Sequence, residues 1–170
     1  MRRGHWLKAM GSAGSPLEDA WLEGDGAGAR RLNRTGFPRR SRIEPGDRLV
    51  YYAPVWRRVF AVVEAVGDPT DEHPVSARWP WTVAIEPLLV VPRLENAPPV
   101  EAIGVPARSM SQQSHIRLRP NQYDLAVEVL ASVAAQPRFR LGVTSHAVEL
   151  LYRDSNKRVI ARHELGPAPS

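Results

Sequence analysis

Aromatic side chains that could stack on a flat ligand occur in two short segments of this chain. Trp79 and Trp81 lie two residues apart, so a regular strand would point both indoles to the same side unless Pro80 breaks the alternation. Tyr51 and Tyr52 are adjacent on a predicted strand and therefore face opposite sides. At most one of these tyrosines can enter a pocket, and we favour Tyr52.

Polar side chains that could read the edge of such a ligand follow in a third segment, from Ser109 to His115. Hydroxyl and amide groups in one turn can donate and accept hydrogen bonds at the same time. Ser111 is our first choice for a ligand contact. His115 either stacks on the ligand or satisfies a nearby backbone group.

Reactive motifs are missing from the sequence. The absence of cysteine excludes a disulfide framework, a thiolate zinc site and a cysteine nucleophile. The five histidines are scattered without ligand spacing, and no glycine-rich phosphate loop or nucleophile elbow is present. We therefore predict a non-catalytic protein without metal or cofactor, with a hydrolase or transferase hidden in the same pocket as the weakest alternative.

The net charge of +5 comes almost entirely from arginine, with 21 Arg against 2 Lys. Six arginines between residues 30 and 42 have no acid among them. Guanidinium groups bind phosphate oxygens bidentately, so this cluster suits a nucleic-acid backbone as well as it suits a solubilising surface. No apolar run is long enough to cross a membrane, and we expect a cytoplasmic protein.

The elements that must position these groups are mostly short strands. Strands are predicted at 5–10, 48–53, 59–66 and 81–90, the last bent or ended near Pro87. A short helix is expected at 15–22, an irregular basic loop at 29–46, and a Pro-rich connection at 92–105. The clearest helix starts at Pro120, presents Leu125, Val129, Leu130 and Val133 on its apolar face, and stops at Gln136-Pro137. A hairpin follows, with strands at 147–152 and 158–162.

The order of these segments resembles the EVE domain family of PUA-like β-barrels, which are related to the YTH readers of methylated RNA. The match rests on the run from Ile43 to Tyr52 (I-E-P-G-D-R-L-V-Y-Y), the Trp79-to-Ile85 segment and the Ser109-to-Leu118 turn. It covers about residues 4–135. The loop at 22–42 departs from the family pattern, in which a second tryptophan often precedes basic residues.

The resemblance implies an α+β fold, a small and mostly antiparallel β-barrel with a few flanking helices. Residues 1–137 would form this domain, and 138–170 a C-terminal β-hairpin extension packed on or beside the barrel. It also implies a pocket that accepts a flipped-out base, often a modified one, from DNA or RNA. Modified cytosine in DNA is a ligand class of bacterial EVE domains, and methyladenine in RNA is one of YTH domains.

A flipped base gives up its stacking, so the protein must offer an aromatic surface in return. The candidate base-binding residues are Trp6, Ser12, Asn33, Tyr52, Trp79, Trp81, Ser111, Ser114 and His115. The candidate phosphate-binding residues are Arg34, Arg39, Arg40 and Arg117. Trp6 could equally pack in the core, and Ser12 could equally cap its own turn. The main alternative function is binding of a small nucleoside-like metabolite without any polymer.

Overall fold

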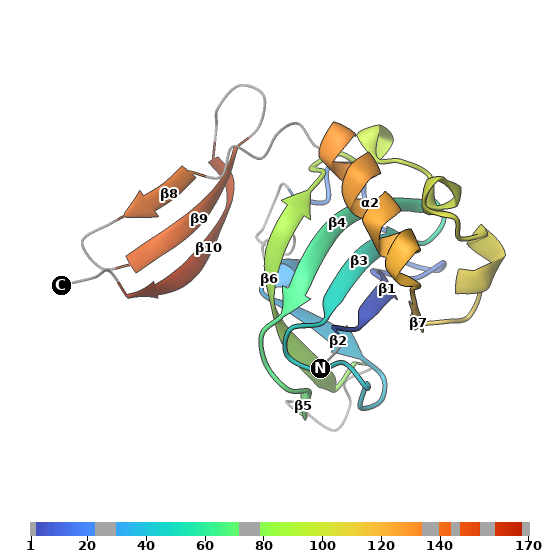
Figure 1. Cartoon of the computed structure of the whole chain (residues 1–170), viewed down its shortest axis with the longest axis horizontal. Helices are drawn as coiled ribbons and strands as arrows, with labels where there is room; N and C mark the ends of the chain where they lie inside the picture. The colour runs from blue at the N-terminus through green and yellow to red at the C-terminus, as the bar shows by residue number, and fades with distance from the viewer. Residues whose placement is uncertain are drawn as a thin grey trace.

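The computed structural model describes residues 3–22, 30–71, 79–133, 140–143, 147–153 and 159–167. Seven strands form the main sheet: β1 (His5–Ala9), β2 (Arg34–Phe37), β3 (Arg48–Ala53), β4 (Arg58–Ala65), β5 (Thr70–Asp71), β6 (Trp81–Val90) and β7 (His115–Arg117). Short 3-10 helices, η1 (Leu94–Asn96), η2 (Val100–Ile103) and η3 (Ala107–Met110), precede β7. The helix α2 (Pro120–Val133) follows it. Figure 1 shows the sheet curling around itself with α2 across one face.

The main sheet has the strand order β2-β6-β4-β3-β1-β7, with β5 paired to β6. All of its pairings are antiparallel except that of β1 with β3. Side chains join the two edge strands: the Phe37 ring on β2 meets the His115 ring on β7 edge-on, with centroids 5.0 Å apart. The predicted fold class, a small α+β and mostly antiparallel PUA-like barrel, is confirmed.

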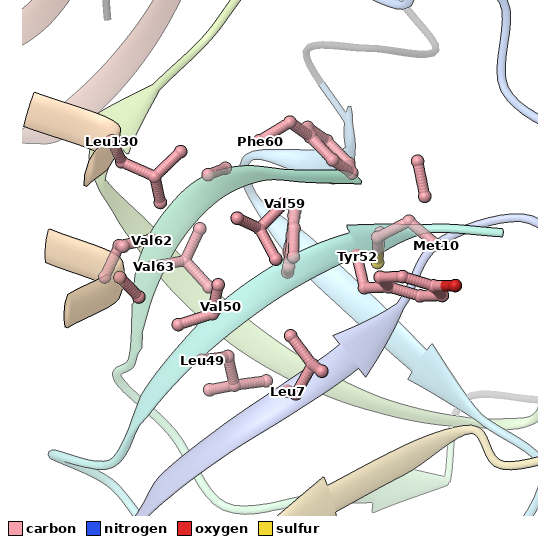
Figure 2. Packing of buried hydrophobic residues seen from close by; sticks show 14 of the residues in the cluster. Leu7, Met10, Leu49, Val50, Tyr52, Val59, Phe60, Val62, Val63 and Leu130 are labelled. Atoms are coloured by element: carbon pink, nitrogen blue, oxygen red, sulfur yellow. The ribbon is translucent and has the colours of Figure 1, made fainter. Parts of the chain in front are cut away.

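An apolar layer joins the helix to the sheet. Figure 2 shows part of one hydrophobic cluster, which contains Leu130 of α2 together with Val62 and Val63 of β4, Leu49 and Val50 of β3, and Leu7 of β1. Tyr123, Ala126 and Leu130 are the buried residues of α2. Of the four residues predicted for its apolar face, Leu125 and Val133 are exposed instead, because the buried stripe runs through Tyr123, Ala126 and Leu130.

Two local predictions are wrong. Residues 15–22 form turns, not a helix, because tertiary contacts hold them: Trp21 Nε1 donates to the Val91 carbonyl at 2.9 Å, and Leu94 N donates to the Asp19 carbonyl at 3.0 Å. The basic loop contains the strand β2, whose Thr35 and Phe37 are buried against β6. The Pro-rich connection contains η1 and η2.

At Pro87, β6 continues, and its pairing with β4 shifts register, as suits a residue without an N–H.

The C-terminal residues form a second sheet of β8 (Arg140–Val143), β9 (Ala147–Arg153) and β10 (Val159–Pro167), all antiparallel. The predicted hairpin corresponds to β9 and β10, and β8 extends it. The expected helix stop at Gln136-Pro137 and the polar turn of the hairpin lie outside the described residues. The division into a domain at 1–137 and an extension at 138–170 stays a prediction.

Candidate base-binding cavity

A cavity of about 1160 Å³ opens at one end of the barrel. It lies where β1 and β3 end, and the turns after β1, β2 and β3, the approach to β6, and the η3-to-β7 connection surround it. Its lining comprises Ala9, Gly11, Ser12, Ala13, Pro38, Tyr52, Pro54, Val55, Arg57, Trp79, Ala107, Arg108, Met110, Ser111, Gln112, Gln113 and Ser114. These residues come from five separate stretches of sequence, so only the folded barrel brings them together.

The aromatic lining consists of Trp79 and Tyr52. Trp79 is 38% exposed, and its Cβ approaches Gly36 of β2 so closely that a Cβ added at Gly36 would lie 3.0 Å from it. Tyr52 is held at the end of β3, where its carbonyl accepts the Met10 N–H at 2.8 Å. Figure 2 shows the Tyr52 ring beside Met10. Its neighbour Tyr51 faces the other way, into the core, and its hydroxyl donates to the Arg31 carbonyl.

The polar lining comes from two turns. In the first, the Ser12 hydroxyl accepts the Ser15 N–H at 3.1 Å, so Ser12 caps its own turn and also lines the cavity. The second turn runs from Ser111 to Ser114, and Ser114 Oγ lies 2.7 Å from His115 Nδ1. The main chain of Ser114 is fixed as well, because its carbonyl accepts the Ala9 N–H at 2.9 Å.

Two basic side chains lie directly behind this lining. Lys8 Nζ lies 5.4 Å from the centroid of the Trp79 ring and donates to the Ala9 carbonyl at 2.7 Å. Burial lowers the pKa of Lys8 to about 7. Burial, and then the charge of Lys8, lower the pKa of His115. His115 itself does not line the cavity; it packs against the rings of Trp6 and Phe37.

Two arginines at the rim, Arg57 and Arg108, were not predicted. Both are exposed, and they come from the β3–β4 turn and from η3. No acidic residue occurs among the described residues of the lining. Arg57 follows Tyr51-Tyr52 in the sequence, and Arg108 directly precedes the Ser109–His115 turn. Both segments had been predicted as part of the site, so a search of their sequence neighbours for basic residues could have found the two arginines.

Trp6 does not line the cavity, which corrects its prediction as a pocket wall. Its indole Nε1 donates to the buried carboxylate of Asp47 at 2.9 Å. Asp47 also accepts the N–H groups of Gly4 at 2.8 Å and Glu44 at 3.1 Å. The Pro45-Gly46-Asp47 turn thus has a structural role, because it supplies the acceptor that keeps Trp6 in the core. The turn requires a φ of +93° at residue 46, which glycine adopts without strain.

Trp81 and Asn33, two further predicted base-binding residues, also lie outside the lining. Trp81 starts β6, and the Arg40 guanidinium lies 5.6 Å from its ring centroid. Trp79 precedes β6, so the alternation of side chains along a strand does not place the two indoles on the same side. Asn33 is tied by its backbone, with its N–H on the Arg30 carbonyl and its carbonyl accepting the Ile85 N–H.

The predicted phosphate-binding arginines are exposed at several places. Arg39 and Arg40 directly follow Pro38, a lining residue, but neither lines the cavity itself. Arg34 opens β2, and Arg117 on β7 lies over the Trp6 ring at 5.1 Å. Phosphate binding by any of the four stays a prediction.

The curled sheet, the flanking helix α2 and the cavity at the barrel end define a small PUA-like α+β barrel with an aromatic, positively charged pocket. Within the described residues, no helix is long and apolar enough to cross a membrane.

Comparison with known proteins finds likeness in structure alone. No family model and no curated protein matches the sequence. A hypothetical protein from Leishmania major has a similar structure, with a TM-score of 0.52 and 12% identity over 77% of this chain and 96% of that one. Protein Rpa0253 from Rhodopseudomonas palustris has a TM-score of 0.50 and 11% identity over 76% and 94%. These two likenesses show a shared fold.

Human THYN1, solved in complex with 5-methylcytosine containing DNA, has a TM-score of 0.46 and 12% identity over 74% of this chain and 96% of that one. A score at that level establishes nothing about this chain.

Proposed function

We propose that this protein is a non-catalytic nucleic-acid-binding module that holds one flipped-out base, of a modified type, in the cavity at the barrel end. The observation that carries the proposal is the composition of the lining. It combines Trp79 and Tyr52 with several hydroxyl and amide groups and with two arginines, and its described residues include no carboxylate.

The aromatic surface supplies the stacking that an extruded base has given up. Stacking of a base on an aromatic side chain contributes about 1–3 kcal/mol. Trp79 suits this role because its indole is partly exposed at the cavity while Gly36 and Lys8 fix it from behind. The apolar side chains of Pro38, Pro54 and Met110 complete the surface that a flat ring would contact.

The hydroxyl and amide groups supply the hydrogen bonds that distinguish one base edge from another. Ser111, Gln112, Gln113 and Ser114 follow one another along one side of the cavity. Serine and glutamine side chains both donate and accept, so they can match the alternating donors and acceptors of a base edge.

The arginines favour a polymer over a free metabolite. Arg57 in the β3–β4 turn and Arg108 in η3 lie at the rim, where the sugar–phosphate chain on either side of an extruded nucleotide would pass. The cavity volume of about 1160 Å³ exceeds the range of about 300–1,000 Å³ that is typical of small-molecule sites. The cavity therefore has room for more than the base.

The test measures binding of fluorescent DNA and RNA oligonucleotides, each with and without a modified base, by fluorescence anisotropy. The modified bases are 5-methylcytosine in DNA and N6-methyladenine in RNA. We expect the wild type to prefer a modified oligonucleotide, and Trp79→Ala to abolish that preference while the fold is kept. Trp81→Ala is the matched control, because Trp81 lies outside the lining.

Salt dependence provides an independent readout. Removing an arginine that binds one phosphate should reduce the slope of log K against log salt by about 0.9 on a duplex or about 0.7 on a single strand. We expect this change for Arg57→Gln and Arg108→Gln, and none for Arg119→Gln, which lies outside the lining. An oligonucleotide affinity that depends neither on salt nor on the modification would refute the proposal. Thermal stabilisation by free nucleosides without any oligonucleotide binding would refute it as well.

A further inference from the structure

The turn between β3 and β4, residues 54–57, holds an apolar side chain out into solvent at the rim of the cavity. Val55 in this turn is 60% exposed, the largest fraction of any large hydrophobic side chain in the described residues. Its φ of +74° lies in the left-handed region, which β-branched residues rarely adopt. Glycine or asparagine would meet that geometry without strain, so the sequence keeps a valine here against the local preference.

The turn is fixed at both ends, so Val55 has a defined direction. The indole of Trp56 donates to the Leu17 carbonyl at 2.8 Å. The N–H of Arg57 donates to the Ala53 carbonyl at 2.9 Å, and the Arg57 carbonyl accepts the Val100 N–H at 2.9 Å. These three bonds link the turn to β3 and to two other segments. An apolar residue on a mobile loop could fold back onto the surface, whereas this one is held away from it.

Backbone strain is concentrated around the cavity. In the described part of the chain, the non-glycine residues with positive φ are Val55, Arg57 and Gln112, and all three line the cavity. Val55 and Arg57 come from one side of it and Gln112 from the Ser111–Ser114 turn. Strained residues that the surrounding structure holds in place tend to mark functional sites.

We propose that Val55 is a wedge that enters the base stack of a double-stranded nucleic acid and fills the space left by the base held in the cavity. This inference rests on the proposed function and narrows its ligand to a duplex. Extrusion of a base leaves an unstacked gap, and an apolar side chain inserted into that gap replaces part of the missing stacking. The insertion also buries a methyl-bearing side chain that is otherwise exposed to water.

The position of Val55 beside Arg57 fits such insertion. Arg57 contacts the backbone phosphate in the proposed function, and Val55 precedes it by two residues in the same fixed turn. The phosphate contact therefore brings the apolar side chain close to the stack from which the base has left. A single strand has no such stack to preserve, so the wedge acts on duplex binding only.

The test compares a short DNA duplex carrying a central 5-methylcytosine, with 2-aminopurine as its neighbour, with the same modified strand alone. The Val55→Gly variant removes the side chain and relieves the positive φ. We expect it to weaken duplex binding about tenfold or more and to leave single-strand binding unchanged. The rise in 2-aminopurine fluorescence that reports unstacking should fall with it. Val66→Ala is the matched control, because Val66 is exposed and lies outside the lining.

The possible failures are distinct. Equal weakening on duplex and single strand would make Val55 part of the pocket wall and overturn the wedge, while the proposed function would stand. Unchanged binding to both forms would overturn the wedge in the same way. Failure of the wild type to bind either form would overturn the wedge, and the proposed function falls with it if the modified RNA of the first test is not bound either. Retained single-strand binding by Val55→Gly also shows that the variant is folded.

Discussion

Replacing Lys8 with methionine should stabilise the protein and remove a specific dependence of its stability on pH. Lys8 is 3% exposed, and its amine lies 4.9 Å from the centroid of Phe37 and 5.4 Å from that of Trp79. Its hydrogen bond is to the neutral carbonyl of Ala9, and no carboxylate pairs with it among the described residues. A buried ammonium without a counter-charge is costly, and that cost lowers the pKa of Lys8 to about 7.

The magnitude follows from the difference between the folded and unfolded chains. An unfolded lysine has a pKa of about 10.4, so between about pH 7 and that value the unfolded chain binds more protons than the folded one. The free energy of unfolding therefore rises with pH, by about 2 kcal/mol from pH 7 to pH 9. Lys8→Met has no proton to bind and therefore shows no such rise. Because it also buries no charge, it should be more stable than the wild type at pH 7.

The assay is urea denaturation followed by tryptophan fluorescence, at about pH 7 and about pH 9, for the wild type and Lys8→Met. Subtracting the two pH responses cancels the groups that titrate alike in both proteins, which leaves the response of Lys8 and of its neighbour His115, whose pKa the charge of Lys8 lowers. Lys8→Arg is the control: it keeps a buried charge at both pH values, so it should be less stable than Lys8→Met without the same rise. Equal pH responses of the wild type and Lys8→Met would refute the reasoning.

Three further substitutions test how the pocket and its supports are built. Asp47→Ala leaves buried N–H donors without an acceptor and should lower the free energy of unfolding by about 3 kcal/mol or more, measured in urea. Gly36→Ala brings a Cβ to 3.0 Å from the Trp79 Cβ, so it should shift Trp79 emission and weaken ligand binding, whereas Gly14→Ala meets no atom within 4 Å and should change neither. Arg58→Met removes hydrogen bonds to three carbonyls of residues 94–97 and should cost about 2 kcal/mol, with a smaller cost for Arg58→Lys.

Each of these has a result that would contradict it. Wild-type stability of Asp47→Ala would mean that the donors find other acceptors. Unchanged ligand binding by Gly36→Ala would show that the position of Trp79 is not critical. Equal stability of Arg58→Met and wild type would mean that residues 94–97 hold their conformation without the guanidinium.

The sequence predicted well those elements whose hydrophobic pattern is strong. The strands around Tyr51, Val62 and Val83 and the helix from Pro120 are at the expected places, because burial on both sides of a sheet or along one helix face leaves a long apolar signature. The strand β2 was missed because Arg34 to Phe37 is too short and polar to show one. Its pairing with β6 is a long-range contact that no local pattern encodes.

The composition of the cavity was predicted only in part, for a similar reason. Ser12, Tyr52, Trp79, Ser111 and Ser114 do line one cavity, although their roles in binding stay predictions. Trp6 was misplaced because its partner, the buried Asp47 carboxylate, is 41 residues away in sequence.

The rim arginines were missed for a different reason. Arg57 and Arg108 reach the rim only through the paths of their turns, and charge clustering pointed to residues 30–42 instead.

The parallel pairing of β1 with β3 has a consequence for how the chain acquires its native state. Residues 5–9 leave the ribosome before both of their partners: they gain one neighbour only with residues 48–52 and the other only with residues 115–117. The cavity spans the same interval, from Ala9 to Ser114, so any fragment that stops before Ser114 lacks part of its wall. During synthesis, competence to bind therefore arises in one late step, when β7 docks beside β1. An occupant that recognises this cavity would report that the main sheet has closed around it, since no fragment that stops before Ser114 presents the whole lining.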